Sequence, residues 1–180
     1  MKLAGGNVEG SKLKRYSDSQ DERNTAIKVR IEGLTIKNGF FTGLPGGVVA
    51  YSDDLKFENI ILTHVGEDGI SNAKEVKNTQ VINCKFYGNA KNDKLLQLNG
   101  AIGAIVKNCL FVGGITAIRC QESSSKNQGG KPRIEGNSFK NVDTAVNASG
   151  RTTVYLKNNT FEGVRLKTKT DSDQVKFIEQ

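Results

Sequence analysis

Two stretches, TQVINCKFYG at residues 79–88 and AIVKNCLFVG at residues 104–113, share the pattern that decides the fold. In each stretch apolar and polar residues alternate up to an Asn, and a second alternating run follows and ends in Gly. Alternation with a period of two predicts short β-strands. The Asn between the runs predicts a bend, because Asn tolerates left-handed backbone geometry and can hydrogen-bond its own backbone. The repeating unit is therefore two short strands joined by a bend.

The same pattern occurs six times. The bend position is occupied by Gly33, Asn59, Asn83, Asn108, Gly136 and Asn158, at intervals of 22 to 28 residues. Three residues further on lie the apolar or aromatic residues Ile36, Leu62, Phe86, Phe111, Phe139 and Phe161. A repeat of this length fits a leucine-rich repeat or a coil of a parallel β-helix, but no repeat has a leucine-rich signature or a helical apolar face. The sequence therefore predicts an all-β fold, a single right-handed parallel β-helix of about six coils.

The two ends of the chain differ from the repeats. Residues 1–24 are polar and basic without a core pattern, which predicts an N-terminal arm or cap, and residues 25–180 form the β-helix domain. At the other end, residues 168–180 offer only Val175, Phe177 and Ile178 for burial. Polar ends are typical of solenoids, because they prevent edge-to-edge pairing of the terminal strands.

Cys84 and Cys109 occupy the same position in adjacent repeats. Stacked strands would bring their α-carbons to about 5 Å, which is within the range for a disulfide. The favoured interpretation is a buried, reduced pair of stacked thiols, because a third cysteine, Cys120, stands alone and three cysteines do not form a disulfide framework.

The balance of charges favours a polyanionic partner. The chain has 26 Lys and Arg against 19 Asp and Glu, a formal net charge of +7. Nucleic acid is not the expected partner, because the Phe residues occupy core positions of the strands instead of interleaving with the basic residues. No apolar run approaches the length of about 18 residues that crosses a membrane, and no apolar signal segment is visible near the N-terminus.

Four charged residues recur at about one coil of separation. Glu67 to Lys94 is 27 residues and Lys94 to Arg119 is 25, so the spacing predicts that Glu67, Asp68, Lys94 and Arg119 lie on three successive coils of one face. A line of this kind suits an acidic sugar chain: paired carboxylates can hold Ca²⁺, which bridges to a uronate carboxylate. The neighbouring Lys and Arg can then stabilise the charge that develops when a carbon acid is deprotonated. The alternative interpretation is a solvated row of ion pairs, each contributing about 0–1 kcal/mol.

Three stretches carry a resemblance to a known family: FENIILTHVGEDGIS at 57–71, NDKLLQLNG at 92–100 and AIRC at 117–120. They resemble polysaccharide lyase family three, the short pectate lyases. The resemblance implies a secreted, extracellular right-handed β-helix that cleaves polygalacturonate or a related acidic polysaccharide by calcium-assisted β-elimination. It makes Glu67 and Asp68 the calcium ligands, Lys94 and Arg119 the substrate-binding and catalytic residues, and Arg119 the candidate base.

The chain departs from that family at two positions. Where the family has a further aspartate one coil before Glu67, this chain has Gly46 or Gly47, and Thr116 stands where the family has a lysine. These departures support a second hypothesis. In it the protein is a non-catalytic β-helix that binds acidic glycan, or a structural component of a virion or surface assembly.

Overall fold

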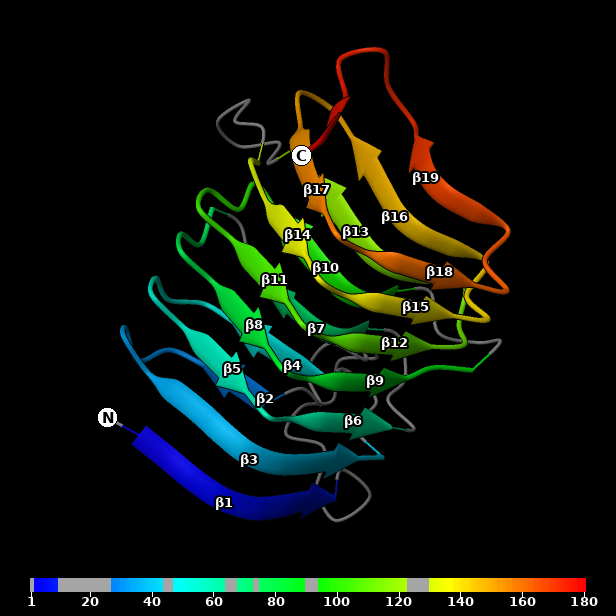
Figure 1. Cartoon of the computed structure of the whole chain (residues 1–180). Coiled ribbons are helices and arrows are strands. Elements are labelled where there is room, and N and C mark those ends of the chain that lie inside the picture. The colour runs from blue at the N-terminus through cyan, green and yellow to red at the C-terminus, as the bar shows by residue number, and fades with distance from the viewer. Residues whose placement is uncertain are drawn as a thin grey trace, which may run out of the picture.

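The computed structural model describes residues 2–9, 27–43, 47–63, 68–72, 75–89, 94–122 and 130–180. In this part of the chain every regular element is a β-strand, and every strand pairing is parallel, between strands of neighbouring coils (Figure 1). None of these residues belongs to a helix that is long and apolar enough to cross a membrane. The prediction of an all-β, parallel β-helix of about six coils is confirmed.

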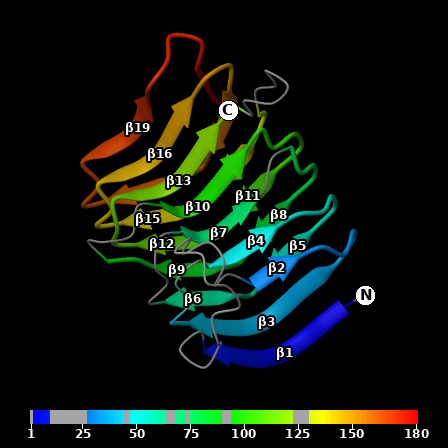
Figure 2. The ribbon, with the colours of Figure 1, turned by 180° about the vertical axis from the view of Figure 1, so that it is seen from behind.

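The strands stack into three faces. Face 1 consists of the first half of β3 (Thr35–Thr42) and of β5 (Lys56–Glu58), β8 (Gln80–Ile82), β11 (Ile105–Lys107), β14 (Arg133–Glu135), β17 (Thr153–Lys157) and β20 (Lys176–Glu179). Face 2 consists of the second half of β3 and of β6 (Ile61–Thr63), β9 (Lys85–Tyr87), β12 (Leu110–Val112), β15 (Ser138–Lys140) and β18 (Thr160–Glu162). Face 3, seen from behind in Figure 2, consists of β2 (Ile27–Val29), β4 (Val48–Ala50), β7 (Asp68–Asn72), β10 (Lys94–Asn99), β13 (Thr116–Gln121), β16 (Thr144–Ser149) and β19 (Leu166–Thr170).

The long strand β3 joins faces 1 and 2. It pairs with β5 through its first half and with β6 through its second half, so the two faces form one 13-stranded sheet, while face 3 is a separate sheet of seven strands. Strand β1 (Lys2–Glu9) pairs in parallel with β3 and so lies at the N-terminal end of the larger sheet. The rest of the predicted arm, residues 10–24, lies outside the described residues.

The bends between faces 1 and 2 have left-handed backbone geometry, as the Asn pattern predicts. Asn59, Asn83, Asn108 and Asn158 have φ between 51° and 54°, and Gly136 has φ 63°. The backbone N–H groups of Asn59, Asn83, Asn108 and Gly136 each donate to a carbonyl of the next coil, for example Asn83 to Lys107 at 3.0 Å. The bends are therefore connected along the helix axis as well as within each coil.

The alignment of the first repeat is wrong by five residues. The spacing places Gly33 with Asn59 and Ile36 with Leu62, whereas in the structure Asn38 bonds Asn59 (3.1 Å, side chain to side chain) and Phe41 pairs with Leu62. Gly33 belongs to the preceding bend, which opens face 1 and has positive φ at Gly33, Asp54, Asn78 and Gly103. The two bends demand the same backbone geometry and therefore the same residue types, which makes them alike in sequence.

A row of aromatic rings runs through the core behind face 2. Phe86, Phe111, Phe139 and Phe161 stack with centroids 4.7, 5.2 and 5.3 Å apart and planes within 9° of parallel. This separation follows the distance of about 4.8 Å between neighbouring strands, because each ring is carried by the equivalent residue of the next coil. The predicted aromatic column is therefore the core of the solenoid from Phe86 onward.

A second inner column begins as cysteine and continues as asparagine. The Cys84 N–H donates to Cys109 Sγ (3.4 Å), the Cys109 N–H to Asn137 Oδ1 (2.8 Å), and the Asn137 N–H to Asn159 Oδ1 (2.9 Å). Each side chain also donates backward, Cys109 Sγ to the Val81 carbonyl (3.4 Å) and Asn137 Nδ2 to the Val106 carbonyl (3.0 Å). A thiol, as weak donor and weak acceptor, thus takes the place of an amide.

The cysteines are reduced and buried, which confirms the favoured interpretation of a thiol pair over a disulfide. The hydrogen bond with Cys84, together with burial, raises the pKa of Cys109. Burial alone raises the pKa of Cys120 to about 12. Because the thiolate is the reactive form, the raised pKa values assign Cys109 and Cys120 a structural role.

The C-terminal end exchanges apolar for polar inner residues. Thr168 and Thr170 of β19 pair with the buried Val146 and Ala148 of β16, so hydroxyl groups cover the last turn of face 3. Phe177 packs against the core, as predicted, while Ile178 is 38% exposed. The final coil therefore ends the apolar interior.

Replacing Cys109 with alanine is expected to lower the free energy of unfolding by about 1–3 kcal/mol, because the buried N–H of Cys84 loses its acceptor. Urea unfolding followed by circular dichroism measures the change. Cys109→Ser keeps a donor and an acceptor and should lose less. An alanine variant as stable as the parent would show that the sulfur contacts contribute nothing.

Candidate functional site

Face 3 contains two rows of register partners, and all the residues of these rows except Leu166 are polar. The first row contains Asp68, Lys94, Thr116, Thr144 and Leu166, which are register partners on successive strands. The second row, three residues further along each strand, contains Ser71, Gln97, Arg119, Asn147 and Lys169. Neighbours within a row are separated by about 4.8 Å, and the rows themselves by about 10 Å. The face therefore repeats polar groups along the helix axis.

Lys94 and Asp68 lie side by side in the first row, as the sequence predicts. Lys94 Nζ is 3.3 Å from Asp68 Oδ1, and their side chains are only 12% and 19% exposed. Each charge is therefore neutralised by the other in a partly desolvated position. Glu67, the other acid of the predicted group, lies outside the described residues.

Arg119 does not follow Lys94. Its register partners are Gln97 and Asn147 in the second row, and the residue that pairs with Lys94 is Thr116. The reason is loop length: six residues separate β9 from β10, but three separate β12 from β13. A count of 25 residues from Lys94 reaches Arg119, which lies three residues beyond Thr116, the first-row residue of β13.

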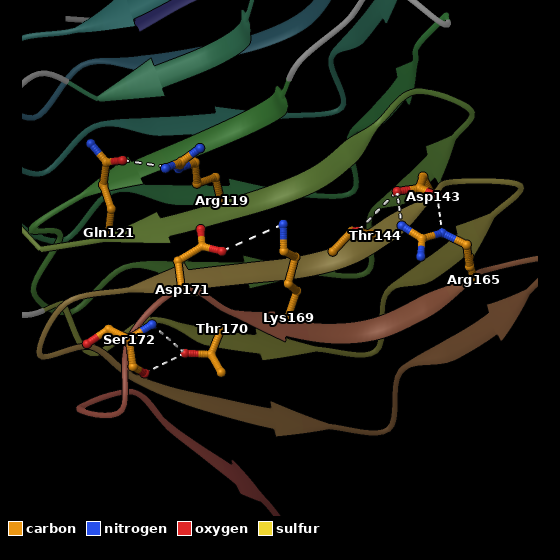
Figure 3. Close-up of polar contacts among 9 residues, drawn as sticks. All are labelled: Arg119, Gln121, Asp143, Thr144, Arg165, Lys169, Thr170, Asp171 and Ser172. Carbon is orange, nitrogen blue, oxygen red and sulfur yellow. Dashed lines mark hydrogen bonds and ion pairs between the residues drawn. The ribbon is translucent and has the colours of Figure 1, made fainter.

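The second row is rich in hydrogen-bond donors. Arg119 Nε donates to Gln121 Oε1 (3.1 Å), and Lys169 Nζ is 3.6 Å from Asp171 Oδ1 (Figure 3). Within the described residues Arg119 makes no ion pair, so its positive charge remains available. Asn147 stands between these two cations; it is 6% exposed, and its Oδ1 has no hydrogen-bond partner among the described residues.

An ion pair anchors the last strand of this face. Arg165, just before β19, donates through Nη2 to Asp143 Oδ2 at 2.9 Å, and the Asp143 carboxylate is also contacted by Thr144 Oγ1 (Figure 3). These bonds, led by the one from Arg165, hold the pKa of Asp143 below its usual range. This exposed ion pair adds to the parallel backbone ladder between β16 and β19, which places Lys169 beside Asn147.

Of the two glycines that stand where the family has its further aspartate, Gly46 lies outside the described residues and Gly47 cannot carry a side chain. Gly47 has φ +63°, and a Cβ at this position would collide with the carbonyl oxygens of Asp68 and Gly69. No group of three His, Cys, Asp or Glu side chains suited to a metal occurs among the described residues. A calcium ion at Asp68 would also compete with Lys94, so the roles of Glu67 and Asp68 as calcium ligands stay predictions.

Sequence reasoning missed Gln97, Asn147 and Lys169. A signal was present for Asn147, because TAIRCQ at 116–121 and TAVNAS at 144–149 share Thr, Ala and an aliphatic residue at their first three positions. Aligning these two segments places Asn147 beside Arg119, as the register does. Lys169 had no such signal, since the last coil replaces the apolar inner residues with threonine.

Residues 16–178 match the family described as the right-handed β-helix region. The chain therefore belongs to the right-handed β-helix family, which agrees with the stacked parallel strands described above. No curated protein matches the chain.

Replacing Gly47 with alanine is expected to destabilise the protein by about 2–5 kcal/mol, because backbone strain adds to a collision with the backbone of β7. Gly33→Ala is the matched control: Gly33 has φ +67° but open space around a Cβ, so only the strain of about 1–2 kcal/mol should remain. Thermal and urea unfolding measure both. Equal losses in the two variants would contradict the collision at Gly47.

Proposed function

We propose that the protein binds an acidic polysaccharide along face 3, outside the cell. The observation that carries the proposal is the second row, in which Arg119 and Lys169 flank the amide of Asn147 on consecutive strands. A guanidinium and an ammonium are strong donors to carboxylates, and amides and hydroxyls suit the hydroxyl groups of sugars. The net charge of +7 favours the same class of partner.

An extended ligand fits this face better than a compact one. Polar side chains recur at each coil from β7 to β16 and continue at Lys169 on β19, so a chain lying along the helix axis meets a comparable set of groups at each step. Within the second row, Gln97 adds an amide and Ser71 a hydroxyl group on the strands that precede Arg119. The repetition of the scaffold thus matches the repetition of a polymer.

β-Elimination is the second candidate; it is supported by the family resemblance and by the position of Asp68, Lys94 and Arg119 on three consecutive strands of face 3. In that reaction a base takes the proton from C5 of a uronate, a C4–C5 double bond forms, and the glycosidic C4–O bond breaks. Arg119 is the base that the family resemblance implies. Because an arginine side chain is a donor without an acceptor, however, its chemistry is better suited to holding a carboxylate, and binding is the leading proposal.

Polygalacturonate binding should weaken about tenfold in Arg119→Ala, because a charge-assisted contact is removed. Isothermal titration calorimetry with size-defined oligogalacturonates measures the affinity. The control is Lys107→Ala, which removes an exposed cation from face 1 and should bind as the parent does. If both variants lose equally, net charge and not face 3 governs binding.

The same samples test catalysis. Near-ultraviolet absorbance of unsaturated uronate is followed with calcium and with a chelator, from neutral to alkaline pH. Product that depends on calcium and on Arg119 would establish the lyase. Binding without product would establish a binding protein. Absence of binding to acidic glycans would refute the proposal and favour a role in a virion or surface assembly.

A further inference from the structure

Face 1 contains a hollow that is separate from face 3. It measures about 370 Å³ and is lined by Ile102, Gly103, Ile105, Lys131, Arg133 and Tyr155. Ile105, Arg133 and Tyr155 are register partners on β11, β14 and β17, and their side chains point outward from the sheet. Such a volume is at the lower end of the range for small-molecule sites.

The hollow has apolar walls. Ile102 and Ile105 are half-buried, and the ring of Tyr155 is the wall contributed by the third strand. Gly103, with φ +69°, leaves the rim without a side chain; a Cβ there would collide with the Asn78 side chain. The bend that opens face 1 thus keeps the hollow open between the two isoleucines.

Two cations border these walls. Lys131 and Arg133 are exposed and make no ion pair or side-chain hydrogen bond among the described residues. The acid nearest in sequence on β14, Glu135, stands in the adjacent outward row between Lys107 and Lys157, so this part of face 1 has an excess of positive charge. An anionic group is therefore the complement of this side of the hollow.

We infer that the hollow binds a small aromatic carboxylate. The carboxylate pairs with Arg133 and Lys131, and the ring lies against Ile105 and Tyr155. A sugar acid fits less well. Apart from the two cations, the Tyr155 hydroxyl is the only polar side-chain group among the lining residues that the structure describes, so most sugar hydroxyls would lose their water without a partner. The site is independent of the proposed binding along face 3.

Benzoate is the probe. Titration into ¹⁵N-labelled protein, followed by heteronuclear NMR, should shift the amides of β11, β14 and β17, and Arg133→Gln should weaken binding about tenfold. Tyr155→Ala should also weaken it, while Tyr155→Phe should not. Lys107→Gln, an exposed cation in the adjacent row, and Arg119→Ala on face 3 should leave the affinity within about twofold.

Each comparison has an outcome that overturns the inference. Benzyl alcohol, which lacks the charge, and galacturonate, which lacks the aromatic ring, should both bind at least tenfold more weakly than benzoate. Equal binding of galacturonate would make the hollow a sugar site. Shifts spread over all basic surfaces would show that benzoate responds only to net charge. An Arg133→Gln variant that is folded and binds unchanged would show that Arg133 does not hold the carboxylate.

Discussion

The stacking of each coil on the next through parallel backbone hydrogen bonds is the interaction on which the structure depends. It sets equivalent residues about 4.8 Å apart, and each side chain then meets its own counterpart. Inside, this demands side chains that stack with themselves, such as Phe86 on Phe111. Outside, it imposes no such demand, and Arg119 can stand beside Asn147. Stacking therefore restricts which residues can point into the core and leaves the outward residues free to vary.

This division explains what the sequence could predict. The alternating runs and Asn bends directly encode backbone geometry, so the fold and the aromatic column from Phe86 onward followed from spacing alone. The candidate site depends on register across face 3, and loops of unequal length precede its strands. Lys94 and Asp68 were correctly paired because their intervening loops nearly match the mean repeat. Arg119 lies on the same face one coil after Lys94, as predicted, but three residues beyond the row of Lys94, because the loop before β13 is short.

The polar rows on face 3 and the hollow on face 1 use the same scaffold differently. On face 3 polar residues recur on strand after strand, which suits a ligand that itself repeats. On face 1 a single run of Ile105, Arg133 and Tyr155 interrupts the repetition with apolar walls, which suits one small molecule. The solenoid therefore has a repetitive polar surface on face 3 and a non-repetitive hollow on face 1.

The hydrogen bonds of the inner column, which contains Cys84, Cys109, Asn137 and Asn159, differ in strength along the helix axis. Sulfur is a weaker hydrogen-bond partner than an amide, so the links between coils strengthen toward the C-terminal half. In a solenoid stability is a sum over neighbouring coils, and opening begins where that sum is smallest. Within this column, the sulfur link between the coils of Cys84 and Cys109 should therefore open before the amide links that Asn137 makes to the coils on either side of it.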